Sequence, residues 1–229
     1  MLGAIFNIFF PQTCFSCKKE VLSDGLCSEC WQKLHFLDQP ACKRCYFQFD
    51  FKIEDNLLCG KCAGKDFYCD TIRSPLRYDV YSKAVILQFK NLNAMHMKNF
   101  FGDILSKMAM EVEIDIIVPV PLHFLRWIWR GYNQSAILAT EVGKRISKDV
   151  ANDLLIRNRF TKSQGKFRKA QREKNIQNAF SLNKKYDVLN KNILLIDDVC
   201  TTGSTLEECA KVLKKFGAKQ VHCLTIAKT

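Results

Sequence analysis

The sequence predicts an α/β fold with a mostly parallel sheet and flanking helices, preceded by a small module with two zinc sites. The first 62 residues hold four Cys-x-x-Cys pairs, a spacing typical of structural zinc. The rest of the chain alternates short β-branched runs with amphipathic stretches, as βαβ units do. With 229 residues, 48% of them hydrophobic and 25% charged, the chain has the composition of a folded globular protein. We expect one module over 1–70 and a second over 71–229.

The zinc module is predicted from pairs of cysteines separated by two residues, a gap that lets both thiolates reach one ion at about 2.3 Å. Nine residues separate the first two pairs and 13 the last two, which suits two zinc ribbons. The simplest assignment is sequential, although the spacing also permits an interleaved one that joins the first and third pairs. The zinc ions would supply folding free energy that so small a core lacks. The predicted ligands are Cys14, Cys17, Cys27, Cys30, Cys42, Cys45, Cys59 and Cys62.

The second module is predicted to begin with short strands, a helical stretch and a buried strand. Residues 71–81 are predicted as one or two short strands, interrupted by Pro75. From 82 to 110 the apolar residues recur at helical spacing, and Ser82 is a plausible N-cap. Residues 114–120 are rich in β-branched side chains, as a buried parallel strand is.

The remaining elements continue the alternation. We expect a helix over 133–147, a buried strand over 192–198 and an amphipathic helix over 204–216 that Gly217 ends. A last strand is predicted over 220–226. Strand and helix alternate throughout, so a mostly parallel sheet with helices on both faces follows.

The charge is concentrated in the second module. Residues 71–229 contain 27 basic and 14 acidic side chains, whereas 1–70 contain 8 and 9. The segment 157–174, predicted as a loop, has eight basic residues and one acid. Such a field attracts phosphate in nucleic acid, nucleotide or pyrophosphate, and a solvated lysine-rich face is the alternative.

The sharpest motif is ILLIDDVCTTGST over 193–205, where a strand ends in Asp197 and Asp198 before a turn that opens a helix. Backbone N–H groups and hydroxyls of such a turn bind phosphate. The two acids suit ribose hydroxyls or Mg²⁺. A plain helix N-cap at 204–205 is the alternative. The predicted phosphate-binding residues are Thr201, Thr202, Gly203, Ser204 and Thr205.

Cys200, just before the helix, raises the hypothesis of a reactive thiol, with a packing residue as the alternative.

This motif resembles the phosphoribosyl pyrophosphate (PRPP) signature of type I phosphoribosyltransferases. Further segments make the chain similar to the ComF family of competence-associated proteins, and the resemblance covers nearly the whole chain. In that family a double zinc ribbon precedes a type I phosphoribosyltransferase-like domain, which matches the four cysteine pairs. The further segments are Pro119–Leu122, Arg130–Gln134 and Gln164 followed by Arg172, Asn175, Ala179 and Phe180.

The resemblance implies roles for particular residues. Asp197 and Asp198 would contact the ribose hydroxyls of PRPP bound with Mg²⁺, and Thr201–Thr205 would hold its 5-phosphate. A hood over 160–175 would cover the site, with Arg172 as its basic contact. The pyrophosphate would be cradled by Val120, Pro121 and Leu122, and its charge neutralised by Arg126 and Arg130.

The resemblance also implies a role in the uptake or processing of single-stranded DNA during natural transformation, with PRPP, single-stranded DNA and DNA-uptake proteins as partners. No local pattern identifies an acceptor, so a phosphoribosyltransferase with an unknown acceptor stands beside an alternative. That alternative is a non-catalytic module that binds a phosphoribosyl ligand or single-stranded DNA. A zinc scaffold that binds protein partners is a third hypothesis.

The apolar runs are shorter than the roughly 20 residues that a membrane helix needs. Residues 1–10 are apolar but lack a basic n-region and a small-residue cleavage site. We therefore expect a cytoplasmic protein without a membrane span, whose 12 cysteines are reduced.

Overall fold

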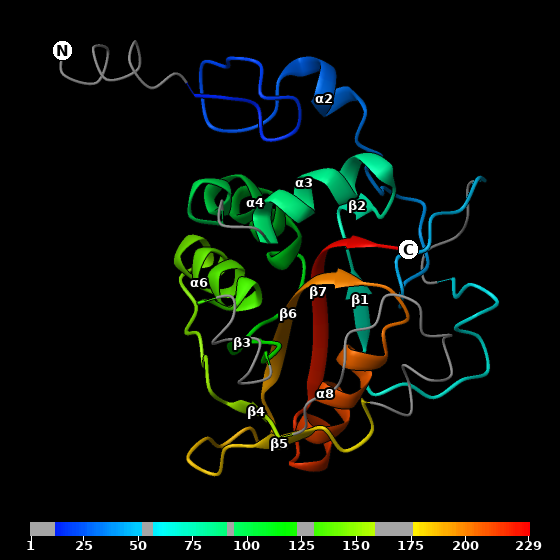
Figure 1. Ribbon diagram of the computed structural model, residues 1–229. Helices are drawn as coiled ribbons and strands as arrows, with labels where there is room; N and C mark the ends of the chain where they lie inside the picture. The colour runs from blue at the N-terminus through cyan, green and yellow to red at the C-terminus, as the bar shows by residue number, and fades with distance from the viewer. Residues whose placement is uncertain (1–11, 52–56, 91–93, 123–130, 159–175) are drawn as a thin grey trace.

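The computed structural model describes residues 12–51, 57–90, 94–122, 131–158 and 176–229. In these residues the main sheet has the order β1-β7-β6-β3, with β2 also beside β7 and every pairing parallel (Figure 1). The predicted α/β fold with a mostly parallel sheet is therefore confirmed. Its strands are β1 (Thr71–Arg73), β2 (Leu76–Arg77), β3 (Ile116–Pro119), β6 (Asn192–Cys200) and β7 (Gln220–Lys228).

Helices cover both faces of this sheet, as the alternation along β6 shows. Ile193 and Leu195 pack into one core with α8 (Ser204–Lys215). Leu194 and Ile196 point the other way, into a core built with helices α3 (Val80–Lys90), α4 (Ala94–Ala109) and α6 (Gln134–Ile146). Because both faces are buried, the strands read as continuous apolar runs.

Most of the expected elements are present. The strands expected over 71–81 are β1 and β2, with Pro75 between them, and the run 114–120 holds β3. The helix expected over 133–147 is α6, which Asn133 caps by accepting from the Ser135 N–H. Gly217 follows α8 with a φ of +91°, the left-handed conformation expected after a helix end.

The helical spacing expected over 82–110 is confirmed and belongs to two helices, α3 up to Lys90 and α4 from Ala94. The predicted cap at Ser82 is wrong, since α3 already begins at Val80. Asp79 caps it: its carboxylate accepts from the N–H groups of Tyr81 and Ser82, each at 2.9 Å. Ser82 Oγ in turn accepts from the Asp79 N–H at 2.9 Å, which completes a capping box.

A second, two-stranded antiparallel sheet was not expected. Strand β4 (Leu155–Arg157) pairs with β5 (Phe180–Leu182). Both strands are three residues long, which is too short for a periodic pattern to reveal.

The cysteine-rich part consists of two similar knuckles and a short helix α2 (Ser28–Gln32). Lys18 and Tyr46 each follow the second cysteine of a pair and have positive φ values of 65° and 56°. Cys14 N–H donates to the Lys19 carbonyl and Cys42 N–H to the Phe47 carbonyl, both at 2.8 Å. The two ribbons thus repeat one local geometry.

The cysteine-rich part shares a hydrophobic core with the helices that cover the sheet. Phe15 and Trp31 each meet Phe100 of α4 edge-to-face, with ring centroids 5.9 Å apart. Figure 1 shows α2 and the first knuckle above α3 and α4. Leu34 and Tyr46 are buried in this same core. The division into 1–70 and 71–229 stays a prediction. Across the described ranges, no helix combines the length and apolarity needed to cross a membrane.

Candidate functional site

Two neighbouring strands bring the predicted site residues to one edge of the main sheet. Asp197 and Asp198 lie near the carboxyl end of β6, and Val120 directly follows β3. The Val120 N–H donates to the Ile196 carbonyl at 2.9 Å, so the loop begins beside the acidic pair. Ligands of open α/β sheets bind at this carboxyl edge.

The two carboxylates have different partners. Asp197 Oδ1 accepts from the Ser135 hydroxyl and from the Asp198 backbone N–H, each at 2.9 Å. Asp198 Oδ2 forms an ion pair of 2.8 Å with the ammonium of Lys90, the last residue of α3. The Lys90 and Asp198 side chains are 22% and 17% exposed. Lysine therefore compensates one of the two negative charges at the place where a ligand would meet them.

The protonation of Asp197 is poised near neutrality. Burial, followed by the negative charge of Asp198, raises the pKa of Asp197 from 3.8 to about 7. The hydrogen bonds from the Asp198 N–H and Ser135 and the charge of Lys90 act in the opposite direction. Asp197 can accordingly exchange a proton at neutral pH, and its ionised form can accept from ribose hydroxyls or bind a cation.

The turn that the sequence predicts to bind phosphate joins β6 to α8. Gly203 is the N-cap of α8 with φ +79°, so the expected cap at 204–205 is not the one formed. A Cβ on Gly203 would lie 3.7 Å from Ile72 Cδ1, an ordinary contact; the left-handed backbone is what favours glycine. Thr202 Oγ1 and Ser204 Oγ lie 2.8 Å apart at the helix N-terminus, where backbone N–H groups favour negative charge.

The far side of this turn is fixed by the end of the chain. Thr229 donates from its N–H to the Cys200 carbonyl at 3.1 Å and from its hydroxyl to the Thr201 carbonyl at 2.9 Å. The N–H of Tyr68 donates to Glu207 Oε2 in the first turn of α8 at 2.8 Å. Both ends of the turn are thereby tied to the rest of the molecule.

The thiol of Cys200 does not have the environment expected of a reactive cysteine. The side chain is buried, and burial raises its pKa to about 12. The helix N-terminus is too weak to offset this desolvation. Cys200 is a packing residue behind the turn.

The segment Tyr132–Ser135 ties the parts of the site together. Tyr132 Oη donates to the Lys90 carbonyl at 3.1 Å. Asn133 Nδ2 donates to the Val120 carbonyl at 3.1 Å, and Gln134 Nε2 to the Lys90 carbonyl at 3.5 Å. Ser135 completes the series through its bond to Asp197. Four consecutive side chains thus position Lys90, the loop after β3 and the acidic pair.

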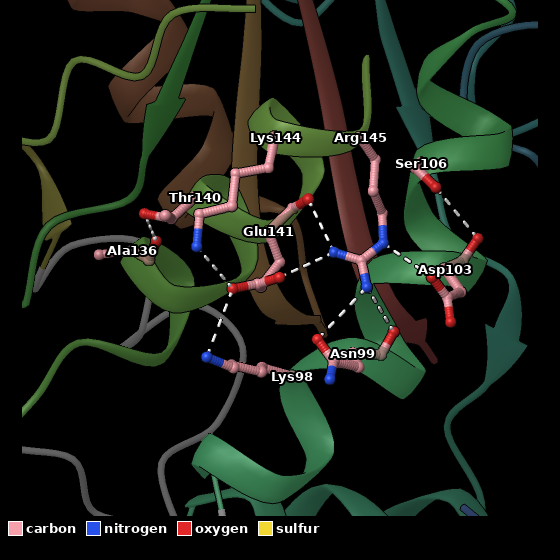
Figure 2. Close-up of polar contacts among 9 residues, drawn as sticks. All are labelled: Lys98, Asn99, Asp103, Ser106, Ala136, Thr140, Glu141, Lys144 and Arg145. Atoms are coloured by element: carbon pink, nitrogen blue, oxygen red, sulfur yellow. Dashed lines mark hydrogen bonds and ion pairs between the residues drawn. The ribbon is translucent and has the colours of Figure 1, made fainter. Parts of the chain in front are cut away.

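Helix α6, which carries Ser135, is held against α4 by an ionic network (Figure 2). Glu141, with a side chain 7% exposed, pairs with Arg145 at 2.8 Å, Lys144 at 3.3 Å and Lys98 at 3.7 Å. Arg145 also pairs with Asp103 of α4 at 2.7 Å. The network fixes the position of α6 and, through it, of Ser135.

The loop expected to cradle pyrophosphate is only partly available to a ligand. Val120 and Pro121 are buried, and Leu122 is half-buried. The N–H and carbonyl of Val120 are both engaged, with Ile196 and Asn133. An anion at this loop would therefore meet the backbone beyond Val120. The expected contacts Arg126, Arg130 and Arg172, and the hood over 160–175, lie outside the described residues.

The sequence pattern missed Lys90. It lies 107 to 108 positions before the acids in the chain and ends an ordinary amphipathic helix, so no local signal marks it. Only the tertiary fold places it at the carboxyl edge of the sheet.

The cysteines form two separate tetrads, and the sequential assignment is confirmed. The sulfur atoms of Cys14, Cys17, Cys27 and Cys30 lie within 4.8 Å of one another, as do those of Cys42, Cys45, Cys59 and Cys62. The Cys17–Cys27 and Cys45–Cys59 sulfurs are each 3.6 Å apart, close to the roughly 3.8 Å of a tetrahedral four-thiolate zinc site. Cys14 and Cys42 also accept backbone N–H bonds at 3.3 Å, which stabilise thiolates. These donor sets fit two structural zinc ions.

The chain matches two protein families. Residues 5–65 match the double zinc ribbon domain, and residues 100–229 match the phosphoribosyl transferase domain. The second match covers more than half of the chain and includes the acidic pair, the turn Thr201–Thr205 and Tyr132–Ser135.

Relatives align over nearly the whole chain. Competence protein F of Haemophilus influenzae is 27% identical, with 96% of this chain and 98% of that protein covered. DNA utilization protein YhgH of Escherichia coli K12 is also 27% identical, with 93% and 96% covered. Competence protein ComFC of Streptococcus pneumoniae is 26% identical, with 89% and 87% covered.

Proposed function

Because the chain belongs to the phosphoribosyl transferase domain family and, with its double zinc ribbon, to the ComF family, we propose that it binds PRPP together with Mg²⁺. The 5-phosphate lies at the turn Thr201–Thr205, and the ribose hydroxyls meet Asp197 and Asp198. The observation that carries this proposal is the juxtaposition of the acidic pair at the end of β6 with the open N-terminus of α8.

The turn Thr201–Thr205 and the acidic pair offer complementary chemistry to a ligand. Backbone amides and hydroxyls at 201–205 donate hydrogen bonds and attract an anion. The carboxylates accept from hydroxyls or bind the oxygen-preferring Mg²⁺. A ribose 5-phosphate has both kinds of group, whereas a free phosphate has only one. Mg²⁺, when bound, would neutralise charge on the pyrophosphate.

A transfer reaction at this site would have to stabilise the departing pyrophosphate and exclude water. We propose that the chain transfers the phosphoribosyl group to an acceptor yet to be identified. Pyrophosphate release from PRPP in the presence of candidate acceptors tests this. Release that Asp197→Asn and Asp198→Asn abolish supports transfer. Tight binding of PRPP without pyrophosphate release in the presence of any acceptor favours the non-catalytic role.

For the biological role we propose handling of single-stranded DNA taken up during natural transformation. The names of the relatives, which refer to competence and to DNA utilization, support it. So does the excess of 27 basic over 14 acidic side chains in residues 71–229.

Gel-shift titration with single-stranded DNA at increasing salt tests this role. We expect binding that weakens steeply with salt and is reduced by charge reversal at Arg168, Lys169 and Arg172. Binding that these reversals leave unchanged would place the DNA contact elsewhere, and no binding at low salt would remove the role.

A further inference from the structure

Lys90 reaches the acidic pair from outside the sheet. It is the last residue of α3, and its ammonium lies 2.8 Å from Asp198 Oδ2. Only 22% of its side chain is exposed. Holding a long, charged side chain in this position costs rotamer entropy and desolvation, so its contact with the acids has to be maintained by the surrounding structure.

That surrounding structure is visible in the hydrogen bonds to the end of α3. Tyr132 Oη donates to the carbonyls of Phe89 at 3.4 Å and of Lys90 at 3.1 Å, and Gln134 Nε2 donates to the Lys90 carbonyl at 3.5 Å. Carbonyls at a helix end lack intrahelical partners. Here side chains from the start of α6 and the segment before it supply them, and they fix where the ammonium emerges.

Lys90 and the turn Thr201–Thr205 approach the acidic pair from different elements. Asn133, between the two residues that hold Lys90, donates to the carbonyl of Val120 in the loop after β3. The backbone of Lys90 is therefore held by the same segment that holds the loop after β3. The turn Thr201–Thr205 continues β6 into α8 and is tied to Thr229 at the end of the chain.

A phosphoribosyl diphosphate needs a cation at this place. Its two charged ends lie on opposite sides of the ribose, and two adjacent carboxylates repel both. An ammonium has three donors, so Lys90 can keep its bond to Asp198 and still bind a phosphate oxygen.

We propose that Lys90 binds the diphosphate end of the phosphoribosyl ligand. This inference rests on the proposed function and names a cationic contact within the described residues. It adds one cationic side chain, at the end of α3, to the residues expected around the diphosphate.

The test compares three ligands by calorimetric titration of the full zinc-loaded chain: PRPP with Mg²⁺, inorganic pyrophosphate with Mg²⁺, and ribose 5-phosphate. For Lys90→Met we expect affinity for the two diphosphates to fall about tenfold or more, since a charge-assisted bond is lost. Affinity for ribose 5-phosphate should change less than about threefold, and Lys90→Arg should retain most diphosphate binding. Lys83→Met, an exposed lysine on the same helix, is the matched control, and Lys90→Gln replaces Lys90→Met if that variant does not fold.

The outcomes separate the two proposals. If the wild type binds ribose 5-phosphate and PRPP but Lys90→Met weakens neither, or weakens both equally, the diphosphate contact is overturned while the phosphoribosyl site stands. If the folded wild type binds neither ligand, the proposed function fails and this inference falls with it.

Discussion

At the residue scale, Asp197 lies in a motif that the sequence reveals, but its environment is one that the sequence does not. Its hydrogen bonds to Ser135 and to the Asp198 N–H hold it in place, while burial and the Asp198 charge raise its pKa to about 7. Such perturbation of a carboxyl at a sheet edge is typical of functional sites. The sequence predicts the pair of acids, but their different partners, Ser135 for Asp197 and Lys90 for Asp198, follow from packing that no local pattern contains.

The raised pKa of Asp197 makes folding stability depend on pH. The folded chain retains this proton up to about pH 7, whereas the unfolded chain loses it near pH 3.8. Between these values the folded state binds more protons, so the contribution of Asp197 to stability falls as pH rises and is least favourable above pH 7. Asp197→Asn, which keeps an acceptor oxygen but cannot ionise, should raise Tm relative to wild type by more at pH 8 than at pH 5.

Thermal melts at both pH values measure this difference. Asp153→Asn is the control, because the exposed Asp153 has a pKa lowered by its hydrogen bond from Lys185, so its substitution should not stabilise the chain. An equal change in Tm for Asp197→Asn at pH 5 and pH 8 would show that Asp197 titrates normally.

Gly203 presents a conformational requirement rather than a steric one. Its φ of +79° lies in the left-handed region, while the space for a Cβ is adequate. Gly203→Ala should therefore cost about 1 kcal/mol of unfolding free energy, measured by urea titration. Gly60→Ala, at a position with no atom within 4 Å of the added Cβ and no positive φ, should cost less; equal costs would mean that the turn relaxes freely.

At the element scale, the strands and helices with long apolar patterns are predicted well and short or interrupted elements are not. Strands β6 and β7 are nine residues each and are buried on both faces, so their composition reveals them. Strands β4 and β5 are defined by pairing with each other. The end of α3 depends on side chains of Tyr132 and Gln134, more than 40 residues away, which sequence periodicity cannot detect.

The α4–α6 network gives a prediction for a single carboxylate. Glu141 is surrounded by Lys98, Lys144 and Arg145 and is nearly buried. Glu141→Gln leaves three cations together without their common anion, so we expect a loss of about 2 kcal/mol in unfolding free energy. Asp103→Asn, in the same network but 67% exposed, should cost less than about 1 kcal/mol. Urea titration of both variants measures these losses in unfolding free energy. An equal loss for the two variants would contradict a central role for Glu141 in packing α6 against α4.

At the scale of the whole molecule, the cysteine-rich part and the sheet are joined by a common hydrophobic core and by hydrogen bonds. Phe15, Leu34 and Tyr46 share one core with Leu76 and Phe101. The second knuckle also contacts the sheet through backbone bonds, because Ile72 N–H donates to the Arg44 carbonyl at 2.6 Å. Lys228 at the end of β7 donates to the carbonyl of Cys45. The sequence predicts both parts but not this common core, since nothing local encodes which surfaces meet.

Removal of zinc should therefore affect the whole chain. We expect a chelator to lower the Tm of the sheet and its helices, because loss of the ribbons exposes the core that they share with α3 and α4. In calorimetry the zinc-loaded ribbons and the sheet should unfold in one transition. A variant with charge removed far from the tetrads, Lys185→Gln, should respond to the chelator as wild type does. An unchanged unfolding transition for the sheet after chelation would show that the two parts are independent.

The measurement that tests the central claim most directly is calorimetric titration of the zinc-loaded chain with PRPP and Mg²⁺, alongside Asp198→Asn and Gly203→Trp. We predict saturable binding by the wild type that both substitutions abolish, because Asp198→Asn replaces a charged acceptor of the ribose hydroxyls with a neutral amide and Gly203→Trp fills the turn Thr201–Thr205. No binding by the folded wild type, or binding that survives both substitutions, would contradict a phosphoribosyl site at the end of β6.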